Sequence, residues 1–249
     1  MGSIKESCWE IIKFAWHFVP VRIRAGIIRL RWKKSFIKNS FTYKNDPNVF
    51  STIYSLNLWG SNESRSGRGS NINATKIIQE KLPVLWKQYE IKTFLDVPCG
   101  DYNWMKGVPK DNIVYIGGDI VAKLIEENNQ KYKTKNISFE LLDITKDILP
   151  TVDMIFCRDC LQHLSYESVF KVLKNFKESN SKYLLTTSYP LTLSNWDIFD
   201  GDYRPLNLRK KPFNFPPSLH KIHEKQKMGE RGSEVDKCMY LYKMNDIRI

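Results

Sequence analysis

The chain has 249 residues, of which 42% are hydrophobic and 13% aromatic, enough to bury the core of an α/β domain and to exclude a largely disordered protein. Five cysteines without framework spacing exclude a disulfide-stapled fold and indicate a reducing, cytoplasmic environment. The net charge of +12 invites a nucleic-acid partner, but residues 1–44 hold ten Lys and Arg against two Glu and so carry +8 of it.

Residues 1–44 form a predicted N-terminal helical extension, separate from a main domain over residues 45–249. Apolar and aromatic residues recur at helical spacing over residues 8–19, and residues 22–34 alternate Arg and Lys with Ile, Leu and Trp. No uninterrupted apolar run reaches the roughly 18–20 residues that span a bilayer. The pattern indicates a basic amphipathic helix, with two alternatives open. Either residues 1–40 contact the inner face of the membrane peripherally, or the helix packs against protein.

A loop over residues 59–70 precedes the first long helix, which is predicted over residues 74–89. The loop is rich in Gly and Ser and has no hydrophobic period. It also holds Glu63, Arg65 and Arg68, so it is a candidate for a loop that faces a ligand.

From residue 93 onward, short apolar strands alternate with helices of about 10–13 residues, the pattern of a parallel sheet covered on both faces. Strands are predicted over residues 93–97, 113–118, 137–142, 152–157 and 183–187. One helix is predicted to begin at Tyr102, and two more to span residues 122–132 and 166–178.

The C-terminal part of the chain departs from this alternation. Residues 189–217 contain many Pro, Asn and Asp residues and no helical period, so a long loop is predicted where the next helix would come, as a lid over the substrate. Strands are predicted over residues 219–224 and 238–243. They form an antiparallel hairpin that completes a sheet of seven strands.

Acidic residues follow the predicted strands at one edge of the sheet. Asp96 and Asp101 flank Gly100 after the first strand, Asp119 ends the second and Asp143 follows the third. In an open α/β sheet, ligands bind at the carboxyl ends of the strands. A carboxylate after the second strand can accept hydrogen bonds from both hydroxyls of a ribose, and Gly100 lets the backbone approach a ligand closely.

The segment from Leu95 to Asp101, with Asp119 and the pair Asp143 and Ile144, resembles the first three motifs of class I S-adenosylmethionine-dependent methyltransferases. The resemblance implies a Rossmann-like, doubly wound, mostly parallel seven-stranded sheet. It also implies S-adenosylmethionine as the cofactor and methyl transfer as the reaction.

The same resemblance implies roles for individual residues. The first motif faces the methionine part of the donor, Asp119 holds the ribose, Asp143 approaches the adenine amine, and Ile144 packs near the base. Pro98 replaces the family's first glycine, and the G-x-G-x-x-G turn of dinucleotide dehydrogenases is absent, which argues against that class. The residues expected to contact the donor are Asp96, Pro98, Gly100, Asp101, Trp104, Asp119, Asp143, Ile144 and Arg65.

A narrower resemblance covers nearly the whole chain after residue 57. It rests on Trp59 with the loop that follows it, on the segment from Phe156 to Leu164, and on the segment from Tyr203 to Leu208. These segments resemble a branch of small class I methyltransferases associated with bacterial surface glycans, with related domains in viral glycan-modifying enzymes. The resemblance implies O-methylation of a sugar, a glycan or a sugar substituent, including a phosphate-type oxygen, as in capsule or polysaccharide biosynthesis.

The acceptor side is predicted from the fourth strand and the long loop. Trp196, Tyr203 and Arg204 are candidates to stack on and hydrogen-bond a sugar, although such aromatic anchors can also merely pin a loop. A hydroxyl acceptor needs its proton removed, and His163, just beyond the fourth strand, is the predicted general base. Asp159 would orient His163 if this stretch makes a helical turn. The alternative in which Asp159 is itself the base stays open.

Two other functions stay open. Charge and aromatic content support nucleic-acid methylation, but the segment from Arg158 to Leu161 stands where nucleic-acid amino-methyltransferases place an Asn/Asp-Pro-Pro-aromatic motif. Nucleic acid is therefore a disfavoured partner. A binding module without catalysis is indicated only by Pro98.

No metal site is predicted. His220 and His223 have an i, i+3 spacing, but on a predicted strand this spacing points them to opposite faces. Cys157 and Cys160 match C-x-x-C without the second pair that a zinc site requires.

Overall fold

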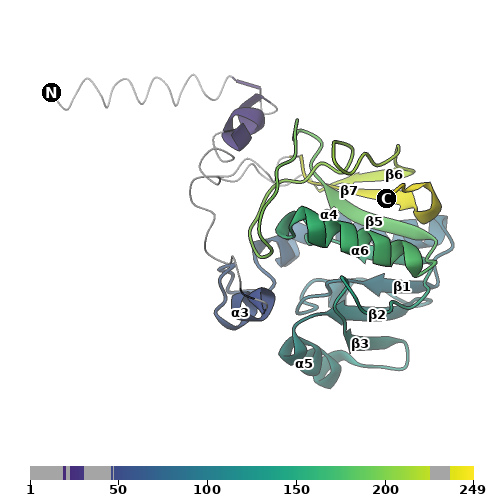
Figure 1. Cartoon of the computed structure of the whole chain (residues 1–249). Coiled ribbons are helices and arrows are strands. Elements are labelled where there is room, and N and C mark those ends of the chain that lie inside the picture. Colours follow the sequence, from purple (N-terminus) through teal and green to yellow (C-terminus); the bar gives the residue numbers. More distant parts are fainter. Residues whose placement is uncertain (1–18, 21–22, 31–45, 47, 225–235) are drawn as a thin grey trace.

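The computed structural model describes residues 19–20, 23–30, 46, 48–224 and 236–249. Within them, seven strands form one sheet in the order β3-β2-β1-β4-β5-β7-β6 (Figure 1). The strands are β1 (Thr93–Asp96), β2 (Val114–Asp119), β3 (Ile137–Leu141), β4 (Met154–Cys157), β5 (Tyr183–Ser188), β6 (His220–His223) and β7 (Cys238–Lys243). Strands β1 to β5 pair in parallel, whereas β7 pairs antiparallel with both β5 and β6. The predicted mostly parallel sheet with an antiparallel C-terminal pair is confirmed.

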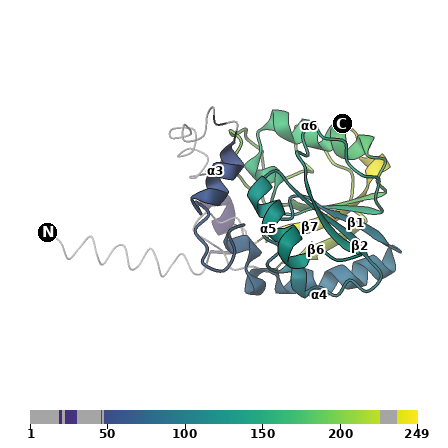
Figure 2. The same ribbon diagram turned by 90° about the horizontal axis from the view of Figure 1, so that it is seen from below.

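Helices cover both faces of this sheet. The α-helices that follow residue 48 are α3 (Val49–Ser55), α4 (Ile72–Gln88), α5 (Ala122–Tyr132) and α6 (Tyr166–Glu178). Single 3₁₀ turns lie at Arg68–Ser70 (η1), Met105–Gly107 (η2), Leu161–His163 (η3) and Met244–Asp246 (η5). Figure 2 shows α4 and α6 on opposite sides of the sheet. Helix α5 contributes to the same hydrophobic cluster as α4, so the sheet is doubly wound.

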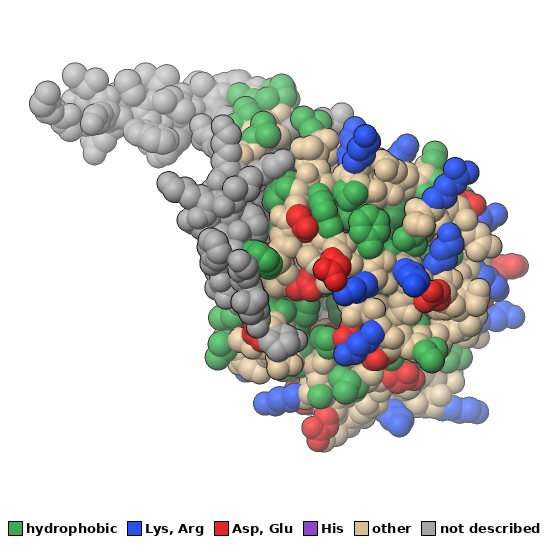
Figure 3. Space-filling view, viewed as in Figure 1, with side chains coloured by type: hydrophobic (Ala, Val, Ile, Leu, Met, Phe, Trp, Pro, Cys, Tyr) green, Lys and Arg blue, Asp and Glu red, His purple; other side chains and the backbone are tan. Residues whose placement is uncertain are grey.

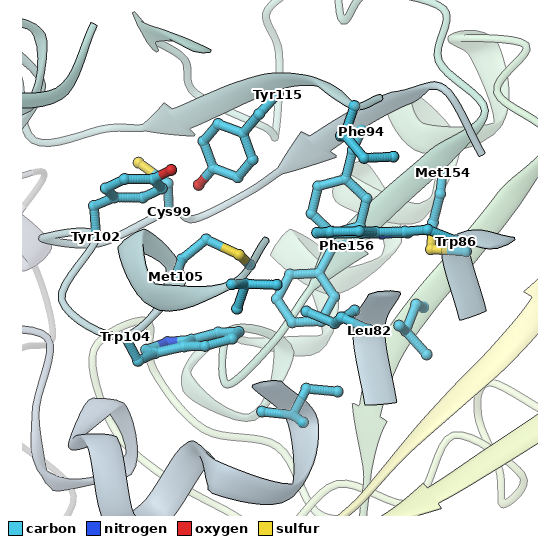
Figure 4. Close-up of a cluster of buried hydrophobic side chains, with 14 of the residues drawn as sticks. Leu82, Trp86, Phe94, Cys99, Tyr102, Trp104, Met105, Tyr115, Met154 and Phe156 are labelled. Atoms are coloured by element: carbon cyan, nitrogen blue, oxygen red, sulfur yellow. The ribbon is translucent and has the colours of Figure 1, made fainter. Parts of the chain in front are cut away.

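Successive strand residues supply the two hydrophobic clusters in turn. In β1, Phe94 packs in the cluster under α4 and Leu95 in the cluster under α6. In β4, Phe156 packs in the cluster under α4 and Ile155 in the cluster under α6. This alternation follows from the two-residue period of a strand. Figure 4 shows Phe94, Phe156 and Trp104 in the first cluster, where the rings of Phe94 and Phe156 lie 5.5 Å apart between centroids. The same cluster includes Cys99, Tyr102 and Trp104, so it packs against the loop that follows β1.

The observed elements agree with most sequence predictions. Strand limits differ by at most two residues, and helix α4 begins two residues earlier than expected. Residues 189–217 contain neither helix nor strand, as predicted. The helix predicted to begin at Tyr102 is wrong, because only the turn Met105–Gly107 forms there. Tyr102 has a left-handed φ of +56°, and Pro109 follows closely, which leaves room for a single turn.

The predicted N-terminal extension over residues 1–44 is described only in part. Residues 23–30 form a helix whose Ala25 and Arg29 side chains are buried. Most of the amphipathic pattern predicted over residues 8–34 lies outside the described residues. In the described part of the chain, no helix combines the length and the apolar character needed to cross a bilayer.

Candidate active site

A cavity of about 400 Å³ opens at the carboxyl edge of the parallel strands. Its walls come from the loops that follow β1, β2, β3 and β4, from α3 and α6, from the loop over residues 59–70 and from Asp200 of the insert. The predicted site residues that line it are Asp96, Pro98, Gly100, Trp104, Asp119, Asp143, Ile144, Asp159 and His163. The predicted site residues that do not line it are Arg65, Asp101, Trp196, Tyr203 and Arg204. The first group lies together because neighbouring parallel strands all end at this edge.

Asp119, the last residue of β2, is held by the backbone on both of its oxygens. The Gly100 amide donates to one oxygen and the Val121 amide to the other, each at 3.1 Å. Burial raises the pKa of Asp119 to about 6, and these backbone hydrogen bonds limit the rise. The side chain is therefore ionised at neutral pH. Each carboxylate oxygen can accept a second hydrogen bond, so a pair of hydroxyl groups in the cavity fits this carboxylate.

Asp96, the last residue of β1, lies at the base of the cavity. The Tyr115 hydroxyl donates a 2.6 Å hydrogen bond to its carboxylate. Burial raises the pKa of Asp96 to about 7, although this hydrogen bond opposes the rise. This position suits an ammonium group as the partner of Asp96. A nearby cation would lower the raised pKa and favour the ionised carboxylate, which can accept hydrogen bonds from the ammonium.

Asp143 and its neighbours form the wall beyond β3. The amide and hydroxyl of Thr145 both donate to one Asp143 oxygen, at 3.0 and 2.6 Å. Burial alone would raise the pKa of Asp143, but these hydrogen bonds and Lys146 lower it. Apolar side chains complete this part of the wall, and they are Ile120, Val121, Leu124, Leu142 and Ile144. A carboxylate beside an apolar slot fits an aromatic base with an exocyclic amine.

The loop over residues 59–70 closes onto Gly100. Asp101 accepts hydrogen bonds from the Ser64 hydroxyl and the Arg65 amide, both at 2.9 Å, and its own amide donates to the Ser66 hydroxyl at 2.9 Å. A Cβ on Gly100, which has a φ of +55°, would lie 2.2 Å from the Ser66 hydroxyl oxygen. This close approach requires glycine.

Two predicted donor contacts therefore have another role. Asp101 faces the loop, and the Arg65 guanidinium donates to the Tyr54 carbonyl at 3.2 Å, so both fix structure around the cavity. In their place, Trp59 and Ser66 reach the cavity. Their loop was predicted to face a ligand, but an aperiodic loop does not tell which of its side chains turn inward.

Beyond β4, four charged side chains form a cluster in which Arg158, Glu224 and Lys237 are buried, and Arg158 and Asp159 line the cavity. Arg158 lies 2.7 Å from Glu224 and 3.2 Å from Asp159, and Lys237 pairs with Asp159 and lies 3.6 Å from Glu224. Gln162 donates to the other Asp159 oxygen at 2.9 Å. Burial alone would raise the pKa of Asp159, but Lys237 and Arg158 lower it to about 2. Asp159 is thus a fixed anion with both oxygens engaged.

His163 ends the turn η3 and faces the cavity between two aromatic rings. Its ring centroid lies 5.3 Å from that of Trp59 and 5.4 Å from that of Tyr203. Its Nδ1 lies 2.8 Å from the Asp202 carbonyl oxygen. A carbonyl can only accept, so Nδ1 carries the proton and Nε2 is the basic nitrogen in the neutral ring.

The long insert holds the turn that carries His163. The amides of Gly201 and Arg204 donate to the carbonyls of His163 and Gln162, at 2.8 and 3.0 Å. The Arg204 side chain is fully buried, donates to the Leu164 carbonyl and lies over the ring of Tyr166 at 5.1 Å.

The predicted substrate contacts of the insert are therefore wrong for two residues. Arg204 is fully buried and Trp196 is 8% exposed, so neither side chain can stack on a sugar. Tyr203 contacts the ring of His163 without lining the cavity. Sequence alone does not distinguish these cases, because burial of a loop side chain depends on packing against distant elements.

Replacing Arg204 by Ala is expected to lower the free energy of unfolding by roughly 2–4 kcal/mol, the scale of emptying a packed interior site. The change also leaves the Leu164 carbonyl without its guanidinium donor. Urea denaturation of the intact protein measures the loss. Arg204→Met retains most of the volume and should recover part of it. Unchanged stability of Arg204→Ala would contradict this structural role.

Within the described residues, no group of three or more His, Cys, Asp and Glu side chains is arranged to hold a metal ion. His220 and His223 do lie on a strand, β6, at its edge position in the sheet.

Comparison with known proteins gives similarity at the level of structure. No protein-family model and no curated protein sequence matches the chain. The N-methyltransferase NodS from Bradyrhizobium japonicum WM9, in complex with S-adenosyl-L-homocysteine, matches with a TM-score of 0.55 and 12% identity over 79% of this chain and 98% of that one. The methyltransferase domain of bacterial CtHen1 matches with a TM-score of 0.50 and 13% identity over 70% of this chain and 100% of that one.

A shorter match is to human N-acetylserotonin methyltransferase in complex with SAM, with a TM-score of 0.44 and 14% identity. It covers 58% of this chain and 42% of that one. At these identities the likeness to NodS and CtHen1 concerns architecture. The chain has the Rossmann-like fold of S-adenosylmethionine-dependent methyltransferases.

Proposed function

We propose that this chain is an S-adenosylmethionine-dependent methyltransferase that methylates a neutral hydroxyl group of a sugar or glycan. The observation that carries the proposal is the content of one cavity, where the acidic strand ends Asp119 and Asp143 and the histidine His163 all face the same space. The fold and the two carboxylates, Asp119 and Asp143, support S-adenosylmethionine as the methyl donor. The histidine supports a hydroxyl acceptor.

The donor half of the cavity fits S-adenosylmethionine. Asp119 would accept from the ribose hydroxyls, Asp143 and Ile144 would hold the adenine, and Asp96 would receive the amino group of the methionine part. Pro98 and Gly100 leave the backbone turn open to the ligand from one side. When bound, S-adenosylmethionine supplies a methyl group on a positively charged sulfur.

Calorimetric titration of S-adenosylmethionine into the intact protein tests the donor assignment. We expect a dissociation constant on the order of micromolar, typical of a cofactor that buries a base and a ribose. A titration without heat at several temperatures, with no protection against thermal unfolding, would remove the donor and with it the proposed function.

The acceptor half favours a neutral group. The charged side chains that line it have partners within the protein: Arg158 pairs with Glu224, Asp159 with Lys237, and Lys171 with Glu167. Asp200 accepts from the Ser165 amide and the Ser168 hydroxyl. A phosphate-type acceptor would need a cation held for it in the cavity, but Arg158 is engaged by Glu224, Asp159 and the Gly69 carbonyl. The spare N–H donors of Lys171 lie on a side chain that is more than half exposed, where water competes for them.

His163 is the better of the two candidate bases. Asp159 already accepts from Gln162, Lys237 and Arg158, and its low pKa makes it a weak base. The hydrogen bond from Nδ1 to the Asp202 carbonyl fixes the tautomer in which Nε2 can take a hydroxyl proton. Asp159 then orients the turn η3 through Gln162.

Trp59 is the proposed platform for the acceptor, since its half-buried ring lies beside His163 and lines the cavity. We expect Trp59→Ala to raise the acceptor KM roughly tenfold, equivalent to about 1.4 kcal/mol, by removal of one stacking face. Trp59→Phe should recover most of the affinity. Donor affinity should stay unchanged in both, and a loss of donor affinity with normal acceptor KM would place Trp59 on the donor side.

Nucleic acid is not favoured as the acceptor. On the face seen in Figure 3, Lys and Arg side chains are interspersed with Asp and Glu, whereas a strand-binding surface is continuously basic. The likeness to NodS and CtHen1 concerns the fold and does not indicate which acceptor this chain methylates.

Residues 23–30 pack against protein through the ion pair of Arg29 and Asp236, whereas both sequence-based alternatives stay open for the rest of the N-terminal extension. Peripheral contact of residues 1–40 with the inner face of the membrane would keep a cytoplasmic enzyme near lipid-linked glycans. The division into an extension over residues 1–44 and a main domain over residues 45–249 belongs to this proposal.

A further inference from the structure

The helix over residues 23–30 is joined to the main domain by a buried ion pair. Arg29 pairs with Asp236, more than 200 positions away, and both side chains are at most 6% exposed. The same guanidinium lies 3.2 Å from the Thr192 hydroxyl and 5.9 Å from the ring centroid of Tyr189. A buried pair with this many partners fixes position, because removal of either charge leaves the other buried alone.

Asp236 connects three segments of the chain. It receives Arg29 from the N-terminal helix and a 2.6 Å hydrogen bond from the Leu191 amide at the start of the long insert. It also stands directly before Lys237, at the entry to β7. The position of the backbone at residues 236–237 therefore depends on what holds the Asp236 side chain.

Lys237 connects this junction to Asp159, which lines the cavity. Its side chain is 3% exposed, pairs with Asp159 in the cavity wall, and lies 3.6 Å from Glu224. Asp159 in turn accepts from Gln162, the neighbour of His163 in η3. The two neighbouring side chains thus reach in different directions, Asp236 toward Arg29 and Lys237 toward Asp159.

We infer that Arg29 is a positioning residue of the active site: it anchors Asp236 so that Lys237 stays on Asp159 in the cavity wall. A residue of the N-terminal extension thereby sets the arrangement around the acceptor side. The name active site rests on the proposed function, whereas the chain of contacts from Arg29 to Asp159 does not. Without Arg29, the Asp236 carboxylate would be buried with no cation among the described residues and would turn toward water, drawing Lys237 with it.

The test measures how well Lys237 is protected in the intact protein. Sulfo-N-hydroxysuccinimide acetate acylates accessible amines, and mass spectrometry of the peptide that contains Lys237 gives its acylation rate. We expect Arg29→Ala to raise that rate about tenfold or more, because local opening exposes the amine. Arg29→Lys, which keeps a positive charge but loses the bidentate geometry, should raise the rate less than Arg29→Ala. Leu30→Ala changes the neighbouring exposed residue of the same helix and serves as the matched control.

A control lysine and a second variant distinguish a local effect on Lys237 from destabilisation of the whole protein. Lys110, whose ammonium donates to the Val108 carbonyl at 2.9 Å and also to the Met105 carbonyl, should keep its acylation rate in every variant. Asp236→Asn removes the same ion pair with a side chain of the same shape, so it serves if Arg29→Ala fails to fold. Expected is faster acylation of Lys237 alone in both variants.

Unchanged protection of Lys237 in both Arg29→Ala and Asp236→Asn would overturn the inference, and so would an equal rise at Lys110. Calorimetry with S-adenosylmethionine on the same samples keeps the two proposals apart. A wild-type protein that fails to bind the donor ends the proposed function, while the acylation rates still decide the role of Arg29.

Discussion

Replacing His163 by Ala is expected to lower the turnover number by roughly 10²–10⁴-fold, the usual contribution of a positioned general base. Donor affinity should stay unchanged, because His163 belongs to the proposed acceptor side of the cavity. Tritium transfer from methyl-labelled S-adenosylmethionine to the best neutral glycoside acceptor measures turnover. His220→Ala provides the matched control, since His220 lies on β6 and does not line the cavity.

The pH dependence identifies which residue is the base. The pKa of Asp159 is lowered to about 2, so this carboxylate stays ionised across the neutral range and cannot produce a change of rate there. If His163 is the base, wild-type turnover should fall on acidification and the residual rate of His163→Ala should lack this fall. Both rates are measured at saturating S-adenosylmethionine, because Asp96 and Asp119 have raised pKa values and their protonation would weaken donor binding. Near-normal turnover in His163→Ala with a dead Asp159→Asn variant would exchange the two roles.

Replacing Asp119 by Ala is expected to weaken S-adenosylmethionine binding by about 1–3 kcal/mol, or roughly 5- to 150-fold, the scale of losing charge-assisted hydrogen bonds. The loss includes the support that the carboxylate gives to the Gly100 and Val121 amides. Glu140→Ala removes the same charge from the exposed face of β3 and should bind the donor normally. Equal affinity in Asp119→Ala and wild type would place the ribose elsewhere.

The sheet and the acidic residues that line the cavity after β1, β2 and β3 were predictable for the same reason. Apolar runs mark the strands, and parallel strands bring the residues that follow them to one edge. Asp96, Asp119 and Asp143 can therefore be assigned to one site from the sequence alone. These assignments depend only on the order and type of the elements.

The residues that sequence reasoning misplaced depend on contacts in three dimensions. Asp101 was expected to face the donor, but three groups of the loop over residues 59–70 reach it first. Arg204 was expected to face the substrate, yet its guanidinium finds the Leu164 carbonyl and the ring of Tyr166 in the interior. Lys237, far from β4 in sequence, carries no local signal for its pairing with Asp159.

Transfer of a labelled methyl group to a defined panel of acceptors tests the central claim most directly. The panel holds neutral methyl glycosides and oligosaccharides, sugar phosphates, and an RNA oligonucleotide, each incubated with the intact protein and tritiated S-adenosylmethionine. The account predicts label on a hydroxyl oxygen of a neutral glycan. It also predicts that His163→Ala transfers this label roughly 10²–10⁴-fold more slowly than the wild type. Label on RNA or only on phosphate oxygens, retained in His163→Ala, would contradict it.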